Sequence, residues 1–165
     1  MILRLALDLP EDATYVRTAR LLSRTLLEDI KVVKGDISDV EVIVSELCSN
    51  VVRHAQSKAM HFVVTLEYYE PEVIITVKDQ GGGFVQGDVL PAGTSRSDGA
   101  GGERYGGYGM SLIEGLSDRL DFTTTQPHGT TVRVVKSLHY ETQRDADKAA
   151  ERDTDHGGIV TASRD

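Results

Sequence analysis

The sequence predicts an α/β sandwich of the α+β class, in which one mixed, mostly antiparallel sheet is covered on one face by helices. Two kinds of segment support this prediction: runs in which apolar and polar residues alternate, as in strands, and runs whose apolar residues recur at helical spacing. They lack the regular alternation of a Rossmann domain, which favours a single sheet. With 165 residues, 39% of them hydrophobic, the chain suits one domain with one core.

The first two predicted elements are a strand and a helix. Leucines alternate with other residues over 3–9, which predicts a half-buried strand, and Pro10 closes it. Residues 11–31 predict a helix, because acidic residues occupy its first turn and apolar residues follow at helical spacing.

A second helix is predicted over residues 36–54, whose apolar residues fall on one side. Gly35 is expected to separate it from the first helix, with Asp36 or Ser38 as its N-cap. The single cysteine, Cys48, lies among apolar residues of this helix. We therefore expect a buried thiol in a reducing compartment.

The rest of the chain is predicted to form a hairpin, a long connection, a helix and two strands. These strands and the helix are expected over residues 62–66, 73–77, 110–120, 120–125 and 130–135. The connection, 85–109, is rich in Gly, Ser and Asp, as in a disordered segment or a functional lid. From residue 139 the composition becomes highly charged, so we expect a domain over 1–138 and a disordered tail over 139–165.

Charge and hydropathy indicate the class of partner and the cellular compartment. The formal charge of −8 argues against non-specific nucleic-acid binding, which needs clustered Lys and Arg. No apolar run approaches the length of a membrane span, and the first residues alternate like a strand, unlike a signal peptide. We expect a cytoplasmic protein whose macromolecular partners are proteins, with neither nucleic acid nor membrane among them.

Four polar residues lie beside the apolar stripe of the second helix: Glu46, Asn50, Arg53 and His54. Asn is a poor residue for a helix interior, so its position one turn after Glu46 suggests a ligand. The alternative is an ordinary surface helix. Arg53 and His54 are expected to support the pocket or the helix end.

Two glycine-rich motifs follow, one ending the hairpin and one opening the next helix: Asp79-x-Gly81-x-Gly83 and Gly106-Gly107-Tyr108-Gly109. The first motif alone could be an ordinary turn. The second places backbone N–H groups at a helix start, where they form an anion cradle, although such loops are common.

Together with the helix over 36–54 and the Gly129-Thr130-Thr131 segment, these motifs resemble the N, G1 and G2 boxes of the Bergerat-type (GHKL) ATP-binding fold. The chain is most similar to the anti-sigma-factor serine/threonine kinases, over residues 1–137. Each motif alone is weak, but the order of all four on the expected elements is specific. The resemblance implies a Bergerat-type fold with ATP and Mg²⁺ as cofactors.

Roles for the polar residues follow from this resemblance and from their chemistry. Asp79 would accept a hydrogen bond from the adenine amine, while Gly81 and Gly83 let the backbone pass close to the purine. Asn50 would be the magnesium ligand through its amide oxygen. Glu46, one turn away, would be the general base.

The second glycine-rich motif is expected to hold the phosphates. Contacts with ATP are expected at Gly106, Gly107, Tyr108, Gly109, Met110 and Thr130. In the kinases that the chain resembles, a basic residue just before this motif approaches the γ-phosphate. Arg104 is the best match, as a second catalytic residue, although it lies one residue further from Gly107 than the pattern; Arg96 is the alternative.

The resemblance implies a kinase that phosphorylates a serine or threonine of a small anti-sigma-factor antagonist protein. It would hold a sigma factor when that antagonist is phosphorylated, and it would form a homodimer through the first strand and helix. Two alternatives remain: a switch kinase that acts on a scaffold protein, and a nucleotide-gated binding module without kinase activity.

Overall fold

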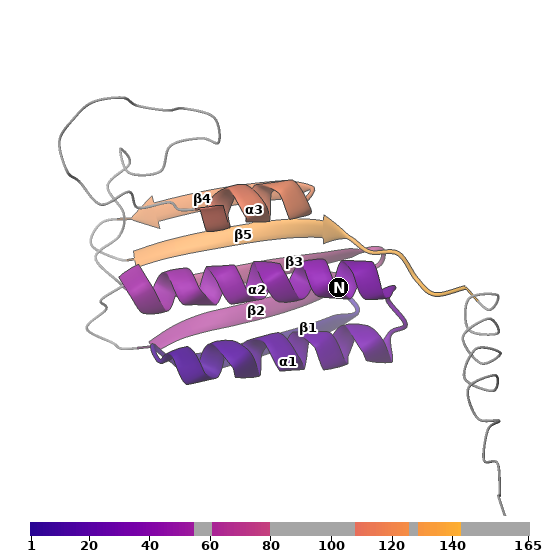
Figure 1. The fold of residues 1–165 in the computed structure, drawn as a ribbon, viewed down its shortest axis with the longest axis horizontal. Coiled ribbons are helices and arrows are strands. Elements are labelled where there is room, and N and C mark those ends of the chain that lie inside the picture. Colours follow the sequence, from indigo (N-terminus) through magenta and orange to yellow (C-terminus); the bar gives the residue numbers. More distant parts are fainter. Residues whose placement is uncertain (55–60, 80–107, 126–128, 143–165) are drawn as a thin grey trace, which may run out of the picture.

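The computed structural model describes residues 1–54, 61–79, 108–125 and 129–142 (Figure 1). In chain order its elements are β1 (Leu3–Pro10), α1 (Ala13–Asp29), α2 (Lys34–His54), β2 (His61–Tyr69), β3 (Glu72–Asp79), α3 (Tyr108–Leu116), β4 (Arg119–Thr125) and β5 (Gly129–Ser137). None of the helices in these ranges combines the length and the apolar character that a membrane span requires.

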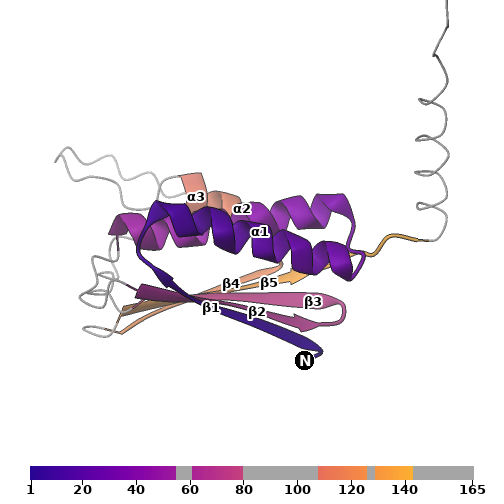
Figure 2. The ribbon, with the colours of Figure 1, turned by 90° about the horizontal axis from the view of Figure 1, so that it is seen from below.

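The helices and the sheet form two layers. Helices α1, α2 and α3 lie on the same face of the sheet (Figure 2). The strand order is β1-β2-β3-β5-β4, and each of the four pairings between neighbours is antiparallel. This architecture confirms the predicted sandwich of one sheet with helices on one face.

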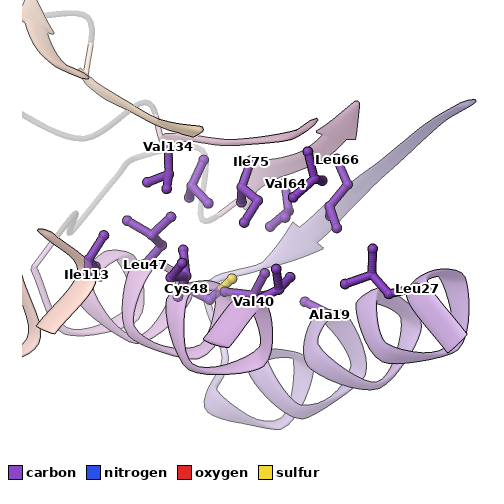
Figure 3. Close-up of a cluster of buried hydrophobic side chains, with 14 of the residues drawn as sticks. Ala19, Leu27, Val40, Leu47, Cys48, Val64, Leu66, Ile75, Ile113 and Val134 are labelled. Carbon is purple, nitrogen blue, oxygen red and sulfur yellow. The ribbon is translucent and has the colours of Figure 1, made fainter. Parts of the chain in front are cut away.

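The core fills the space between the two layers (Figure 3). Alternate residues of β2 and β3, including Val64, Leu66 and Ile75, point toward the helices and are fully buried. The predicted apolar stripe of α2 is buried against them: Val40, Ile43, Val44, Leu47 and Val51. Removing this much apolar surface from water is the main favourable term in folding, and it fixes α2 on the sheet.

Strand β1 lies at one edge of the sheet and is only partly covered. Leu9 is buried, Leu5 and Leu7 are partly buried, and Leu3 is exposed. The predicted half-buried strand is therefore confirmed.

The start of α2 differs from the sequence prediction. The helix begins at Lys34, so Gly35 lies inside its first turn, and neither Asp36 nor Ser38 is its N-cap. Ser38 donates to the carbonyl of Lys34, and Asp36 accepts from the backbone N–H of His139. A glycine is tolerated here because the first N–H groups of a helix have no intrahelical partner.

The chain reverses between α1 and α2 at Lys31, which has a φ of 63°. The N–H of Lys31 bonds the carbonyl of Glu28, and the N–H of Val32 bonds that of Leu27. This pair of bonds is a Schellman motif, which usually has glycine at the left-handed position. A lysine at that position explains why the sequence pointed to Gly35 instead.

Helix α3 is shorter than predicted and begins earlier, at Tyr108. Gly109 and Met110 therefore lie in its first turn. Leu120, which the helical pattern had included, belongs to β4. A strand neighbour decides this position, because Leu120 pairs with Val134 of β5.

After β5 the chain crosses to the connection between α1 and α2. The N–H of Val33 bonds the carbonyl of His139, and the N–H of Glu141 bonds that of Lys31. The hydroxyls of Tyr68 and Tyr140 lie 2.7 Å apart. The rest of the predicted tail, and the predicted lid up to residue 107, lie outside the described residues.

Candidate functional site

The candidate site lies where the second half of α2 meets the first turn of α3. Glu46 and Asn50 are one turn apart on α2, and both are partly buried. Glu46 faces Gly109, and Asn50 faces Met110. The structure thus brings together two motifs that lie far apart in the sequence.

Gly109 allows a close approach between the two helices. A Cβ atom added at this position would lie 2.5 Å from Oε2 of Glu46 and 3.4 Å from its Cδ. Real Cβ atoms do not approach another atom that closely, so any side chain would displace the carboxylate. Because Gly109 has no Cβ, the Glu46 carboxylate can lie against the N-terminal turn of α3, where helix N–H groups favour an anion.

The Asn50 amide is oriented by Met110. Its Nδ2 donates to the thioether sulfur over 3.7 Å, so the amide oxygen is the atom of Asn50 that could bind a hard cation. Among the described residues, no group of three or more His, Cys, Asp or Glu could hold a metal. A magnesium ion at Asn50 would need phosphate and water as its other ligands, and this fits how Mg²⁺ binds with nucleotides.

Asp79 ends β3 as a buried carboxylate, only 4% exposed. The strand register places Thr130 of β5 beside Asp79, because Lys78 pairs with Thr131. The N–H of Thr130 donates to Oδ1 of Asp79 over 3.3 Å. A carboxylate can accept several hydrogen bonds, so it can bond Thr130 and a ligand amine together.

An open groove of about 510 Å³ lies between α1 and α2, and Glu46 is one of the residues that line the groove. Glu41 also lines the groove and binds Arg24 at 2.5 Å and Arg20 at 3.8 Å. The hydrogen bond to Glu41 raises the pKa of Arg24. Glu46 therefore lies between the groove on one side and α3 on the other.

The remaining predicted site residues divide into two groups. Those outside the described residues are Arg104, Gly81, Gly83, Gly106 and Gly107, together with the alternative Arg96. Tyr108 is described as the first residue of α3. Arg53 is exposed at the end of α2 and His54 is its last residue.

The sequence reasoning missed Lys136, a residue of β5 whose side chain is only 12% exposed. The sequence does contain a signal that Lys136 faces the helices. Val132 and Val134 precede it at alternate positions, so Lys136 continues the inward-facing row of the strand toward the helices.

Comparison with known proteins gives a match over most of the chain. Residues 9–136 match the histidine kinase-like ATPase domain family. The chain is 31% identical over 125 residues to an anti-sigma F factor from Pasteuria penetrans, covering 73% of this chain and 81% of that protein. It is 29% identical over 141 residues to the serine-protein kinase RsbW from Bacillus velezensis, covering 82% and 86% respectively.

Two solved structures share the fold. One is the crystal structure of the RsbU and RsbW domains of Rv1364c from Mycobacterium tuberculosis, with a TM-score of 0.62 and 20% identity; the match covers 85% of this chain but 35% of that one. The other, the SiaB–SiaC complex from Pseudomonas aeruginosa, has a TM-score of 0.60 and 13% identity, and the match covers 79% and 88%. At these identities the likeness concerns the fold alone.

Proposed function

The chain belongs to the histidine kinase-like ATPase family and is related to the anti-sigma F factors and RsbW serine-protein kinases, and on this premise we propose that it is an ATP-dependent serine/threonine-protein kinase. One observation carries the proposal: the Glu46 carboxylate lies against Gly109 in the first turn of α3, with Asn50 one turn away. A candidate base, a candidate metal ligand and a candidate phosphate-binding helix start are thus adjacent.

The site residues that the structure describes would have different tasks in binding Mg-ATP. Asp79 would accept a hydrogen bond from the adenine amine while Thr130 holds the carboxylate in place. Guanine has a carbonyl in the equivalent position, so a buried acceptor there discriminates between the purines. The first turn of α3 would donate its N–H groups to the phosphates. Asn50 would bind Mg²⁺, which neutralises charge on the transferring phosphoryl group.

In the transfer step, the oxygen of a serine or threonine side chain attacks the γ-phosphorus of ATP, and ADP leaves with the electrons of the broken P–O bond. Glu46 accepts the proton of the attacking hydroxyl. Glu46 also lines the groove between α1 and α2, which would be the route by which a partner's side chain approaches it. Arg104, in the predicted loop before α3, would stabilise the γ-phosphate.

The relatives' names suggest the partners. We infer that the phosphate acceptor is a small anti-sigma-factor antagonist protein, and that the kinase sequesters a sigma factor in a partner switch. The kinase domain would span 1–138 and act in the cytoplasm. A charged tail would follow over 139–165, and its first residues, 139–141, lie against the connection between α1 and α2. Dimerisation through β1 and α1 is consistent with the position of β1 at an edge of the sheet.

The test combines capture and transfer. The tagged protein is used to capture partners with and without Mg-ATP, and each captured protein is then purified and incubated with γ-labelled ATP. Label on a serine of a small antagonist, together with a captured sigma factor, would support the proposal. Label on a large scaffold would favour the switch kinase that acts on a scaffold. Nucleotide-dependent capture without any transfer would indicate a binding module.

A further inference from the structure

Lys136 places a positive charge on the helix-covered face of the sheet. It lies in β5 opposite Val73 of β3, which is fully buried. Its side chain is only 12% exposed. Removing a lysine from water costs free energy unless its ammonium group is fully paired, so its partners indicate what it does.

The ammonium group of Lys136 joins two helices. Nζ lies 2.9 Å from Oδ2 of Asp39 and 3.8 Å from Oδ1 of Asp36, both in the first half of α2. It also donates to the carbonyl of Leu116, the last residue of α3, over 3.1 Å. The last carbonyls of a helix lack intrahelical partners and carry partial negative charge, so a cation is favoured there.

These contacts complete a pair of connections between α2 and α3. At one end, Glu46 and Asn50 of α2 meet the first turn of α3. At the other end, about 16 Å along α2 from Asn50, Lys136 links Asp39 to the C-terminus of α3. The two helices are thus held against sliding along each other at both ends.

We propose that Lys136 is a positioning residue, which keeps α3 in register with α2 so that the N–H groups at the start of α3 face the ATP phosphates. This inference rests on the proposed function. Lys136 lies at the far end of α3 and acts only through the helix. Its effect therefore falls on the phosphates and leaves the adenine end, at Asp79, unchanged.

Stability alone is a weak reason for this cluster. Apolar residues of similar volume often replace a buried ion pair without loss of stability, because the desolvation cost offsets the attraction. An ammonium group with three defined partners differs from an apolar contact in being directional, since it fixes where α3 ends relative to Asp36 and Asp39. The position of α3 along α2 is therefore the property that the Lys136 variants should change.

The experiment compares ATP with adenosine, which lacks the phosphates. Dissociation constants for both, with Mg²⁺, are measured by calorimetry alongside the melting temperature. The variants are Lys136→Met, Lys136→Arg and the double variant Lys136→Met/Asp39→Asn, which removes the ammonium group together with the carboxylate nearest to it, while Asp36 keeps its charge. Lys34→Met is the control, since Lys34 is exposed and its loss changes the net charge equally.

Lys136→Met should reduce the preference for ATP over adenosine by about 10- to 100-fold, the equivalent of one charge-assisted hydrogen bond to the phosphates. Lys136→Arg, which keeps the positive charge, should keep most of the wild-type preference for ATP over adenosine. The double variant should regain part of the melting temperature lost in Lys136→Met, because Asp39 no longer leaves an unpaired charge, without regaining the preference. Lys34→Met should match the wild type.

Two results would overturn the inference: an unchanged preference for ATP, or a loss that disappears in the double variant together with the stability defect. Failure of the wild type itself to bind ATP would instead contradict the proposed function.

Discussion

The carboxylate of Glu46 occupies the space that a side chain at position 109 would need, since a Cβ there would lie 2.5 Å from Oε2. Gly109 does not have a positive φ, unlike Gly129. Space, and not backbone conformation, is therefore what requires glycine at this position. The contact ties the proposed base to the helix that would hold the phosphates.

Substituting Gly109→Ala should reduce phosphoryl transfer while leaving the protein folded. The new methyl group must push the Glu46 carboxylate aside, which a flexible side chain can do at little cost. Displacing a base by about 1 Å can cost on the order of 100-fold in rate. The transfer rate at saturating ATP and the melting temperature would be measured together.

Gly115→Ala is the matched control for this substitution. Gly115 lies in the same helix, and a Cβ there would meet no atom within 4 Å. Both substitutions gain up to about 1 kcal/mol of helix propensity. Gly115→Ala should therefore keep the wild-type rate, and equal rates for the two variants would show that the Glu46 contact has no catalytic importance.

Asp79→Asn should fold but bind ATP about 10- to 100-fold more weakly, the usual effect of losing a charge-assisted hydrogen bond. If the side-chain oxygen keeps its bond to the Thr130 N–H, the new amide group presents a donor to the adenine amine. Calorimetry with ATP measures the loss. Binding at the wild-type level would mean that adenine is not recognised at Asp79.

Much of the fold could be predicted because its signals are local. The alternation of Val64 and Leu66 and the helical spacing of Val40 and Leu47 each reflect one buried face, and the structure buries all four. The pattern of Glu46 and Asn50 could also be recognised, since both lie one turn apart on a single helix.

The features that could not be predicted depend on tertiary contacts. The reversal at Lys31 has no local signal, because a lysine rarely adopts the left-handed conformation. The partners of Lys136 come from two helices that are distant in the sequence. The closeness of Gly109 to Glu46 likewise depends on how α3 packs on α2, which no spacing within either motif reveals.

Alkaline pH should destabilise the protein through Cys48. Burial raises the pKa of this thiol to about 12, so the folded state holds the proton more tightly than the unfolded state does. The resulting stabilisation is fully present below about pH 8.5, the ordinary thiol pKa, and is lost as the pH rises toward 12. Above the ordinary pKa, the free energy of unfolding should fall by up to about 1.4 kcal/mol per pH unit.

Denaturant unfolding between pH 8 and 10 measures this slope. Cys48→Ala should be less stable at pH 8 but should lose less stability as the pH rises. The pKa of Tyr140 is also raised, by burial and by its hydrogen bond to Tyr68, but its contribution begins only near pH 10. Equal slopes for the wild type and Cys48→Ala over this range would rule out Cys48 as the group responsible.

The final prediction separates catalysis from binding by using two residues one helical turn apart. Glu46→Gln keeps the size of the side chain and its contact with α3, but the amide cannot accept a proton. It should bind Mg-ATP almost normally, whereas transfer to the partner should fall by about 10²- to 10⁴-fold, the usual contribution of general acid–base catalysis.

Asn50→Ala should act at the earlier step. It removes the proposed magnesium ligand and the contact with Met110, so Mg-ATP binding itself should weaken. Calorimetry with and without Mg²⁺ distinguishes the two roles: Asn50→Ala should lose the magnesium-dependent part of the affinity, and Glu46→Gln should keep it. Since Glu46→Gln binds without turnover, its complex with the partner should persist. If this variant transfers phosphate at the wild-type rate, Glu46 is not the base, and another group must remove the hydroxyl proton.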